Sequence, residues 1–186
     1  GGRVVLGLGA GWQENEHEKY GFDFSTLKGR LDMLDEAVEI VTSMLANERT
    51  NLDGEHYRIV DAPLDPKPLQ EKVPLLIGGG GKKRTLRTAA RYADEWNYWG
   101  MPDDIRELCG ALDAHCADIG RDPAEIQRSA VALMFISEDE GYLGKLRGRD
   151  FGRATILGTP DEVADIVAQY RDCLLYTSDA ADDETS

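Results

Sequence analysis

The feature that most constrains the fold is a short apolar run that ends in glycines and leads into an amphipathic helix. Residues 4–9 are a continuous run of β-type residues and glycine, the pattern of a strand buried on both faces of a parallel sheet. From Leu31 to Leu45, leucines and valines recur every three or four residues with acids between them, which predicts a helix of at least four turns. A strand followed by such a helix is the repeating unit of α/β proteins.

The same unit recurs along the rest of the chain. Turn residues and prolines interrupt it over residues 47–72, and we interpret this stretch as an insertion with one short strand. Thr159 and Pro160, followed by two acids, predict the start of the last helix. The other predicted strands are 73–77, 95–99 and 129–137, and the other predicted helices are 83–92 and 104–119.

This order of elements implies right-handed parallel crossovers and leaves two architectures open. One is an open doubly wound sheet, and the other is part of a (β/α)8 barrel, the TIM barrel. A whole barrel needs about 250 residues, so four units in residues 1–172 amount to roughly half of one. We expect a partial α/β barrel over residues 1–172, with the insertion at 47–72.

The end of the chain has a different character. Its string CLLYTSDAADD resembles the translation of a sequencing adapter, which predicts that residues 173–186 are a non-native tail from the assembly of environmental DNA. The alternative is an ordinary acidic tail. In either case the rest of the chain stays acidic.

Composition excludes several classes of protein. The chain is 41% hydrophobic and 30% charged, as globular proteins are, and its formal net charge of −14 disfavours nucleic acid as a partner. It has no apolar run of the roughly 20 residues that a membrane span requires. Three irregularly spaced cysteines predict no disulfide framework and suit a reducing compartment. We therefore expect a cytoplasmic protein with neither nucleic acid nor membrane as a partner.

A run of four glycines separates a predicted buried strand from a predicted helix. Gly78, Gly79, Gly80 and Gly81 leave several backbone N–H groups unshielded just before the helix N-terminus, which is the pattern of a phosphate site. Lys82 adds positive charge and Thr85 adds a hydroxyl. The alternative is a flexible turn with solvated basic residues.

Further candidate residues follow the other predicted strands. The string GLGAGW departs from the dinucleotide fingerprint GxGxxG, because its third glycine comes one position early. Trp96 and Asn97 place an aromatic ring and an amide on the third strand, where a core position is the alternative to a ring pocket. Cys109, His115 and Cys116 lack the spacing of a tetrahedral metal site, so we predict no metal.

Five motifs in order resemble the bacterial luciferase-like superfamily, in particular its F420-dependent oxidoreductases. They are GGRVVLGLGAGWQENEHEKYG, GRLDMLDEAVEIV, DGEHYRIVDAPLDPKPLQ, PLLIGGGGKKRTLRTAARYADEWN and GRDPAEI. The resemblance implies a (β/α)8 barrel of which this chain holds about strands 4 to 7. It also implies coenzyme F420 as the cofactor, or FMN as in other branches.

The resemblance assigns cofactor contacts by position. It places the cofactor phosphate at the four glycines, with Lys82 or Thr85 as helpers, and it places Ala10, Gly11, Trp12 and Asn15 beside the ring. Trp12 stands where F420-dependent sugar-phosphate dehydrogenases have a glutamate acid, which counts against sugar-phosphate chemistry. With Trp96 and Asn97, these residues are the candidate cofactor site.

The reaction that the resemblance implies is hydride transfer between the deazaflavin and a small organic substrate. The alternatives are an FMN-dependent monooxygenase and a relative that binds cofactor without turnover. A homodimer of the full-length protein is a further expectation. Substrate-facing and proton-transferring residues of the family come largely from early strands that this chain lacks. We therefore assign no catalytic residue.

Overall fold

The centre of the fold is a four-stranded parallel sheet in the order β1-β4-β5-β6. The computed structural model describes residues 2–174. A second, two-stranded parallel sheet follows, and an antiparallel hairpin lies apart from both. The strands of the main sheet are β1 (Leu6–Leu8), β4 (Leu75–Gly78), β5 (Glu95–Trp99) and β6 (Gln127–Val131), those of the second sheet are β7 (Leu133–Ile136) and β8 (Thr155–Gly158), and those of the hairpin are β2 (Thr50–Asp53) and β3 (Arg58–Ala62).

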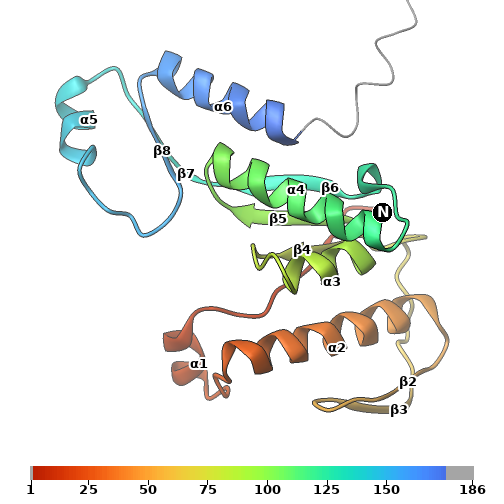
Figure 1. Cartoon of the computed structure of the whole chain (residues 1–186). Helices are drawn as coiled ribbons and strands as arrows, with labels where there is room; N and C mark the ends of the chain where they lie inside the picture. Colours follow the sequence, from red (N-terminus) through yellow and green to blue (C-terminus); the bar gives the residue numbers. More distant parts are fainter. Residues whose placement is uncertain (1, 175–186) are drawn as a thin grey trace, which may run out of the picture.

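Four helices form a layer along one side of the strands. They follow one another from bottom to top in Figure 1 as α2 (Leu27–Ala46), α3 (Thr85–Tyr92), α4 (Pro102–Asp118) and α6 (Pro160–Leu174). Fully buried residues of this layer include Val38, Leu86 and Leu112, which share one core with Ile77 and Trp96 of the sheet. The hydrophobic core therefore lies between the sheet and its helices, as in the wall of an α/β barrel.

The opposite face of the sheet carries no helix in the part of the chain that the structure describes. Side chains of a strand alternate between faces, so Ile77 and Trp96 enter the core while their strand neighbours point the other way. On that second face Gln127 and Val131 of β6 are exposed. The chain thus has the curved, one-sided form of part of a barrel wall. The face of the sheet that carries no helix is called the inner face below.

The predicted elements of the main sheet are confirmed within a few residues. The strand predicted at 129–137 is divided at Ala132 into β6 and β7, which pair with different neighbours. The elements that were not predicted include α1 (Glu14–Tyr20), α5 (Glu140–Leu146), β8, and β2 as a second strand of the insertion. Each is seven residues or shorter, too short for a periodic pattern to emerge from the sequence.

The insertion folds into the hairpin β2–β3, whose turn is attached to helix α2 by one carboxylate. Glu36 accepts hydrogen bonds from the backbone N–H groups of Glu55, His56 and Tyr57, at 2.8 to 3.2 Å. Desolvation alone would raise the pKa of Glu36, but the three N–H donors outweigh it and hold that pKa below its usual value of 4.5. This contact fixes the turn of the hairpin against the helical layer.

Helix α6 ends at Leu174, and residues 175–186 lie outside the described part of the chain. The adapter-like tail predicted for 173–186 falls almost entirely there and stays a prediction. Among the described residues, none of the helices has the length and apolar character to cross a bilayer.

Candidate functional site

Alternate residues at the end of β1 are glycines on the inner face. Leu6 and Leu8 pack against the core, whereas Gly7 and Gly9 are exposed on the other side. A Cβ on Gly9 would lie 3.5 Å from the backbone oxygen of Gly78, so the ends of β1 and β4 run close together. Gly7 and Gly9 thus follow the two-residue period of a strand, whereas Gly11 lies beyond the strand with a φ of 72°.

The register of the sheet places a polar row beside these glycines. Gly78 pairs with Asn97, and Asn97 pairs with Ser129, so the three residues stand side by side across β4, β5 and β6. Asn97 and Ser129 are half-buried. The inner face therefore has a bare part bounded by a polar part. We call the bare part the glycine floor. It consists of Gly7, Gly9 and Gly78, and the side chain of Leu76, which pairs with Gly7, lies beside it.

The loop after β4 is held by contacts with the protein itself. The Gly79 N–H donates to the backbone oxygen of Asn97 at 3.0 Å, and the Trp96 indole N–H donates to the Gly79 oxygen at 2.9 Å. Gly79 has a φ of 127°, which favours glycine. A Cβ on Gly80 would lie 2.4 Å from the Tyr98 ring. Two of these glycines are therefore required by backbone conformation and packing, whatever ligand the loop binds.

The other face of the loop offers unused hydrogen-bond donors. Within residues 2–174, the backbone N–H groups of Gly80, Gly81, Lys82 and Lys83 donate to no acceptor. Thr85 is 5% exposed, and its hydroxyl lies 2.7 Å from the position that a Cβ on Gly81 would occupy. That hydroxyl has no hydrogen-bond partner among the described residues. Four free amides and a free hydroxyl before a helix N-terminus have the donor chemistry that binds a phosphate.

Basic side chains near the loop turn mostly toward acids. Arg84 forms ion pairs with Asp35 at 2.7 Å and Asp32 at 2.5 Å, and these hydrogen bonds raise the pKa of the guanidinium. Lys82, one of the two residues predicted to help bind phosphate, pairs with Glu107 of α4, and its contact with a phosphate stays a prediction. The loop therefore depends on backbone donors more than on side-chain charge.

Three of the predicted site residues follow β1, two in the loop after it and one in helix α1. Ala10 packs against the core, and Gly11 has a φ of 72° with the His17 ring against it. Asn15 is an exposed residue of α1. Nothing in these contacts links Asn15 to the glycine floor, and its predicted contact with the ring stays a prediction.

Trp12 lies beside an arginine that the sequence analysis did not single out. The Arg153 guanidinium lies 5.6 Å from the centre of the Trp12 ring and 4.8 Å from that of Trp99. The Trp99 indole N–H donates to the backbone oxygen of Ala154 at 3.2 Å. These contacts bring the loop before β8 to the carboxyl ends of β1 and β5, where barrels bind their ligands.

Trp96 and Asn97 have different surroundings although they are neighbours in the chain. Trp96 is fully buried and stacks against Tyr98, with ring centres 6.2 Å apart. It supports the glycine loop from inside the core. Asn97 lies on the inner face, where its side chain donates to Ser129. Of the two, only Asn97 has a side chain placed to contact a ligand on the glycine floor.

Sequence reasoning missed Glu95, Ser129 and Arg153. Glu95 and Ser129 share the inner face with Asn97. Glu95 lies two residues before Asn97 in β5, and Ser129 pairs with Asn97 across β5 and β6. Extending the two-residue period of strands 95–99 and 129–137 to both faces would have found them. Arg153 had no such signal, because it precedes the unpredicted strand β8.

The cysteines are placed for packing. Cys109 and Cys116 are buried on α4, and desolvation raises the pKa of both thiols. Across residues 2–174, no three acidic, cysteine or histidine side chains cluster in a way that would hold a metal ion.

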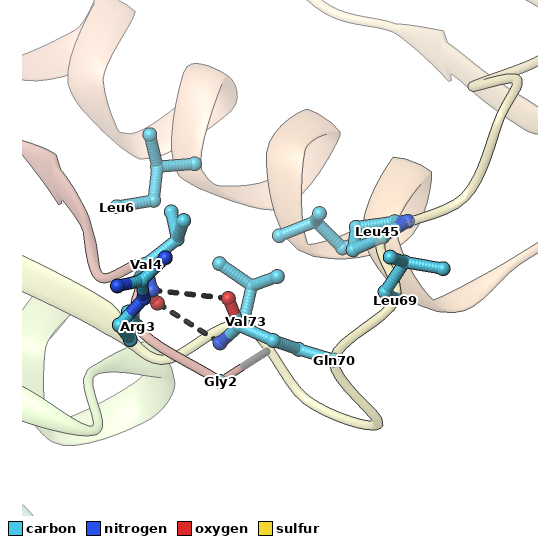
Figure 2. Close-up of a pocket in the computed structure, with 9 residues that line it drawn as sticks. Gly2, Arg3, Val4, Leu6, Leu45, Leu69, Gln70 and Val73 are labelled. Atoms are coloured by element: carbon cyan, nitrogen blue, oxygen red, sulfur yellow. Dashed lines mark hydrogen bonds between the residues drawn. The ribbon is translucent and has the colours of Figure 1, made fainter.

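A pocket lies at the opposite, amino-terminal edge of the sheet. It is lined by Val4, Leu45 and Val73 among others (Figure 2). The side-chain amide of Gln70 donates to the backbone oxygen of Val4 and accepts from its N–H, both at 3.0 Å, as a neighbouring strand would. In barrels this edge serves stability, so we place the functional site at the glycine floor.

The sequence matches the model of the luciferase-like monooxygenase family over residues 1–143. The chain belongs to this family. Its fold agrees: the parallel strands and their helices are part of a luciferase-like TIM barrel, which confirms the predicted fold class.

Curated relatives of the luciferase-like chain include F420-dependent enzymes. An uncharacterised protein of Mycobacterium tuberculosis is 32% identical over 171 residues, which are 91% of this chain and 57% of that protein. The F420-dependent glucose-6-phosphate dehydrogenase of Microbacterium testaceum is 38% identical over 123 residues, 64% of this chain and 36% of the enzyme. The luciferase-like chain therefore spans about half or less of the length of these relatives.

Solved structures with the same fold include an F420-dependent dehydrogenase and a monooxygenase. An F420-dependent secondary alcohol dehydrogenase in complex with an F420-acetone adduct has a TM-score of 0.79 at 18% identity, and the match covers 93% of this chain and 62% of that one. A monooxygenase from Streptomyces bottropensis has a TM-score of 0.71 at 19% identity and covers 93% and 59%. At these identities the likeness concerns the luciferase-like fold alone.

Proposed function

We propose that this chain forms the cofactor-binding part of an F420-dependent oxidoreductase, which transfers a hydride between the deazaflavin and a small organic substrate. The observation that carries the proposal is the glycine floor beside a loop of free backbone N–H groups. A planar ring can lie against a surface without side chains, while a phosphate reaches the loop. The F420-dependent relatives support this choice of cofactor.

Each part of the site has a physical task in this proposal. When bound, F420 supplies a ring carbon that gives or accepts a hydride. The backbone N–H groups of Gly80 and Gly81 and the Thr85 hydroxyl bind the phosphate, and the Trp96 indole keeps the loop in place. The ring of Trp99 and the Arg153 side chain cover the carboxyl edge and limit the access of water.

An FMN-dependent monooxygenase is the second candidate. FMN also combines a planar ring with a phosphate, so the same floor and loop suit it, and monooxygenases are among the structures with this fold. A relative that binds cofactor without turnover is the third candidate.

Titration of the intact protein that carries this chain with F420, and separately with FMN, tests the proposal through the fluorescence of each ring. We expect micromolar or tighter binding of F420 and weaker binding of FMN. Tight binding of FMN without F420 binding would favour the monooxygenase. Binding of F420 without hydride transfer to any of a broad panel of alcohols and ketones would favour the non-catalytic relative.

A matched pair of variants tests the phosphate loop. Thr85→Val removes the free hydroxyl with little change of shape, and we expect F420 affinity to fall about tenfold, the effect of one hydrogen bond to a charged group. Thr42→Val is the control, because Thr42 is exposed on α2 and lines a pocket at the opposite edge. Equal affinities of the two variants would argue against phosphate binding by the Thr85 hydroxyl.

We further propose that the whole protein acts in the cytoplasm, as a homodimer, on a small-molecule substrate. The net charge of −14 supports the absence of nucleic acid among its partners. Size-exclusion chromatography with light scattering on the intact protein tests the homodimer.

A further inference from the structure

We propose that Glu95 and Ser129 are positioning residues, which hold the Asn97 carboxamide in one orientation so that its oxygen faces a ligand on the glycine floor. The inference rests on the proposed cofactor site and deepens it, because it predicts which edge of the ring the protein recognises. No role for Glu95 or Ser129 follows from the cofactor-binding proposal alone.

The three side chains form a chain of hydrogen bonds across the inner face. The Asn97 Nδ2–H donates to Ser129 Oγ at 2.8 Å, and the Ser129 hydroxyl in turn donates to Glu95 Oε1. All three side chains are half-buried, which strengthens such bonds relative to bonds in water.

The donor and acceptor of each of these hydrogen bonds follow from the number of protons available. A carboxylate only accepts, and a hydroxyl has a single proton, so the Ser129 proton is committed to Glu95. The Ser129 oxygen must then accept from Asn97, which requires the nitrogen of the amide to face it. A flipped amide would set two acceptor oxygens against each other. The network thus resolves the orientation of a group that is otherwise free to turn.

The orientation leaves one acceptor unused at the edge of the glycine floor. Asn97 Oδ1 is turned away from Ser129 and accepts no hydrogen bond within residues 2–174. Asn97 pairs directly with Gly78, which has no side chain to fill the space beside the amide. A ligand lying on the floor therefore meets a fixed carbonyl oxygen.

A fixed acceptor selects a ring with an N–H donor at its edge. Flavin and deazaflavin rings carry such a donor, the imide N–H between two carbonyl groups. A methyl group on that nitrogen would remove the donor and leave the Asn97 oxygen without a partner. Sites built to hydrogen-bond a ligand group discriminate strongly against analogues that lack it.

The test compares F420 and FMN with their derivatives methylated at the imide nitrogen, each titrated into the intact protein by ring fluorescence. For the cofactor that binds, we expect the wild type to prefer the unmethylated ring by at least about tenfold. Ser129→Ala and Glu95→Gln free the amide to turn, and we expect the preference to fall to about twofold. Ser129→Thr keeps a hydroxyl and restores the preference.

Gln127→Ala is the control, because Gln127 is exposed on the same face of β6. A merely structural role of Ser129 would lower the affinity for both rings without changing their ratio. The inference fails if the wild type shows no preference, or if the preference survives in both Ser129→Ala and Glu95→Gln. In those cases the cofactor still binds and the proposed function stands. If neither parent cofactor binds the wild type, both proposals fail.

Discussion

Replacing Trp96 by phenylalanine should destabilise the protein through the glycine loop. Trp96 has no exposed surface, and its indole N–H donates to the Gly79 oxygen at 2.9 Å. Removing that donor leaves a carbonyl group beside the core without this partner, at a cost of roughly 1–3 kcal/mol. The smaller ring loses about 1 kcal/mol more in buried apolar contact. We expect the free energy of unfolding to fall by about 3 kcal/mol.

Trp99→Phe is the matched control for this change. It makes the same substitution in the same strand, but Trp99 is 36% exposed and its bond to the Ala154 oxygen is longer, 3.2 Å. Water can replace that bond, so we expect a loss of about 1 kcal/mol. Urea unfolding of the intact protein and its two variants gives both values. Equal losses in the two variants would refute the reasoning that the buried bond to the loop dominates.

Three further predictions concern contacts away from the floor. Asp113→Ala leaves the buried Arg128 guanidinium unpaired and should cost about 2 kcal/mol in urea unfolding, largely recovered when Arg128→Met is added. Gly80→Ala places a methyl against the Tyr98 ring and should cost about 1–3 kcal/mol in the same assay, less in a Tyr98→Leu background. Glu36→Gln should speed proteolysis of the hairpin at pH 7, and the wild type should lose the same protection only as the pH falls below about 4.5, because the folded-state pKa of this carboxyl is lowered.

The sequence predicted the main sheet and its helices because their periodic patterns are long. Val38 and Leu112 lie in helices of 20 and 17 residues, where several turns repeat the same apolar spacing. Ala132 interrupts a strand whose apolar pattern continues across the break, so its division into β6 and β7 left no signal. Short elements such as α5 depend on contacts that no local pattern records.

The candidate site was predictable where it depends on the backbone and less so where it depends on side-chain direction. The run from Gly78 to Gly81 marked the loop correctly as a strand-to-helix turn. Whether Lys82 faces that loop or Glu107 is decided by helix α4, which is distant in sequence. The link between Asn97 and Ser129 needed the register of two strands separated by a helix, which only the folded chain supplies.

The glycine floor couples ligand binding to folding. Glycine in a strand is destabilising by roughly 0.5–1 kcal/mol relative to alanine, and the floor has two such positions, Gly7 and Gly78. A planar ring lying on these glycines would make the apolar contacts that side chains would otherwise make there, so that ligand binding would add to the stability of the fold. Stabilisation by a bound ligand grows with the logarithm of its concentration. The melting temperature of the intact protein would then report on occupancy of this surface, even where turnover cannot be measured.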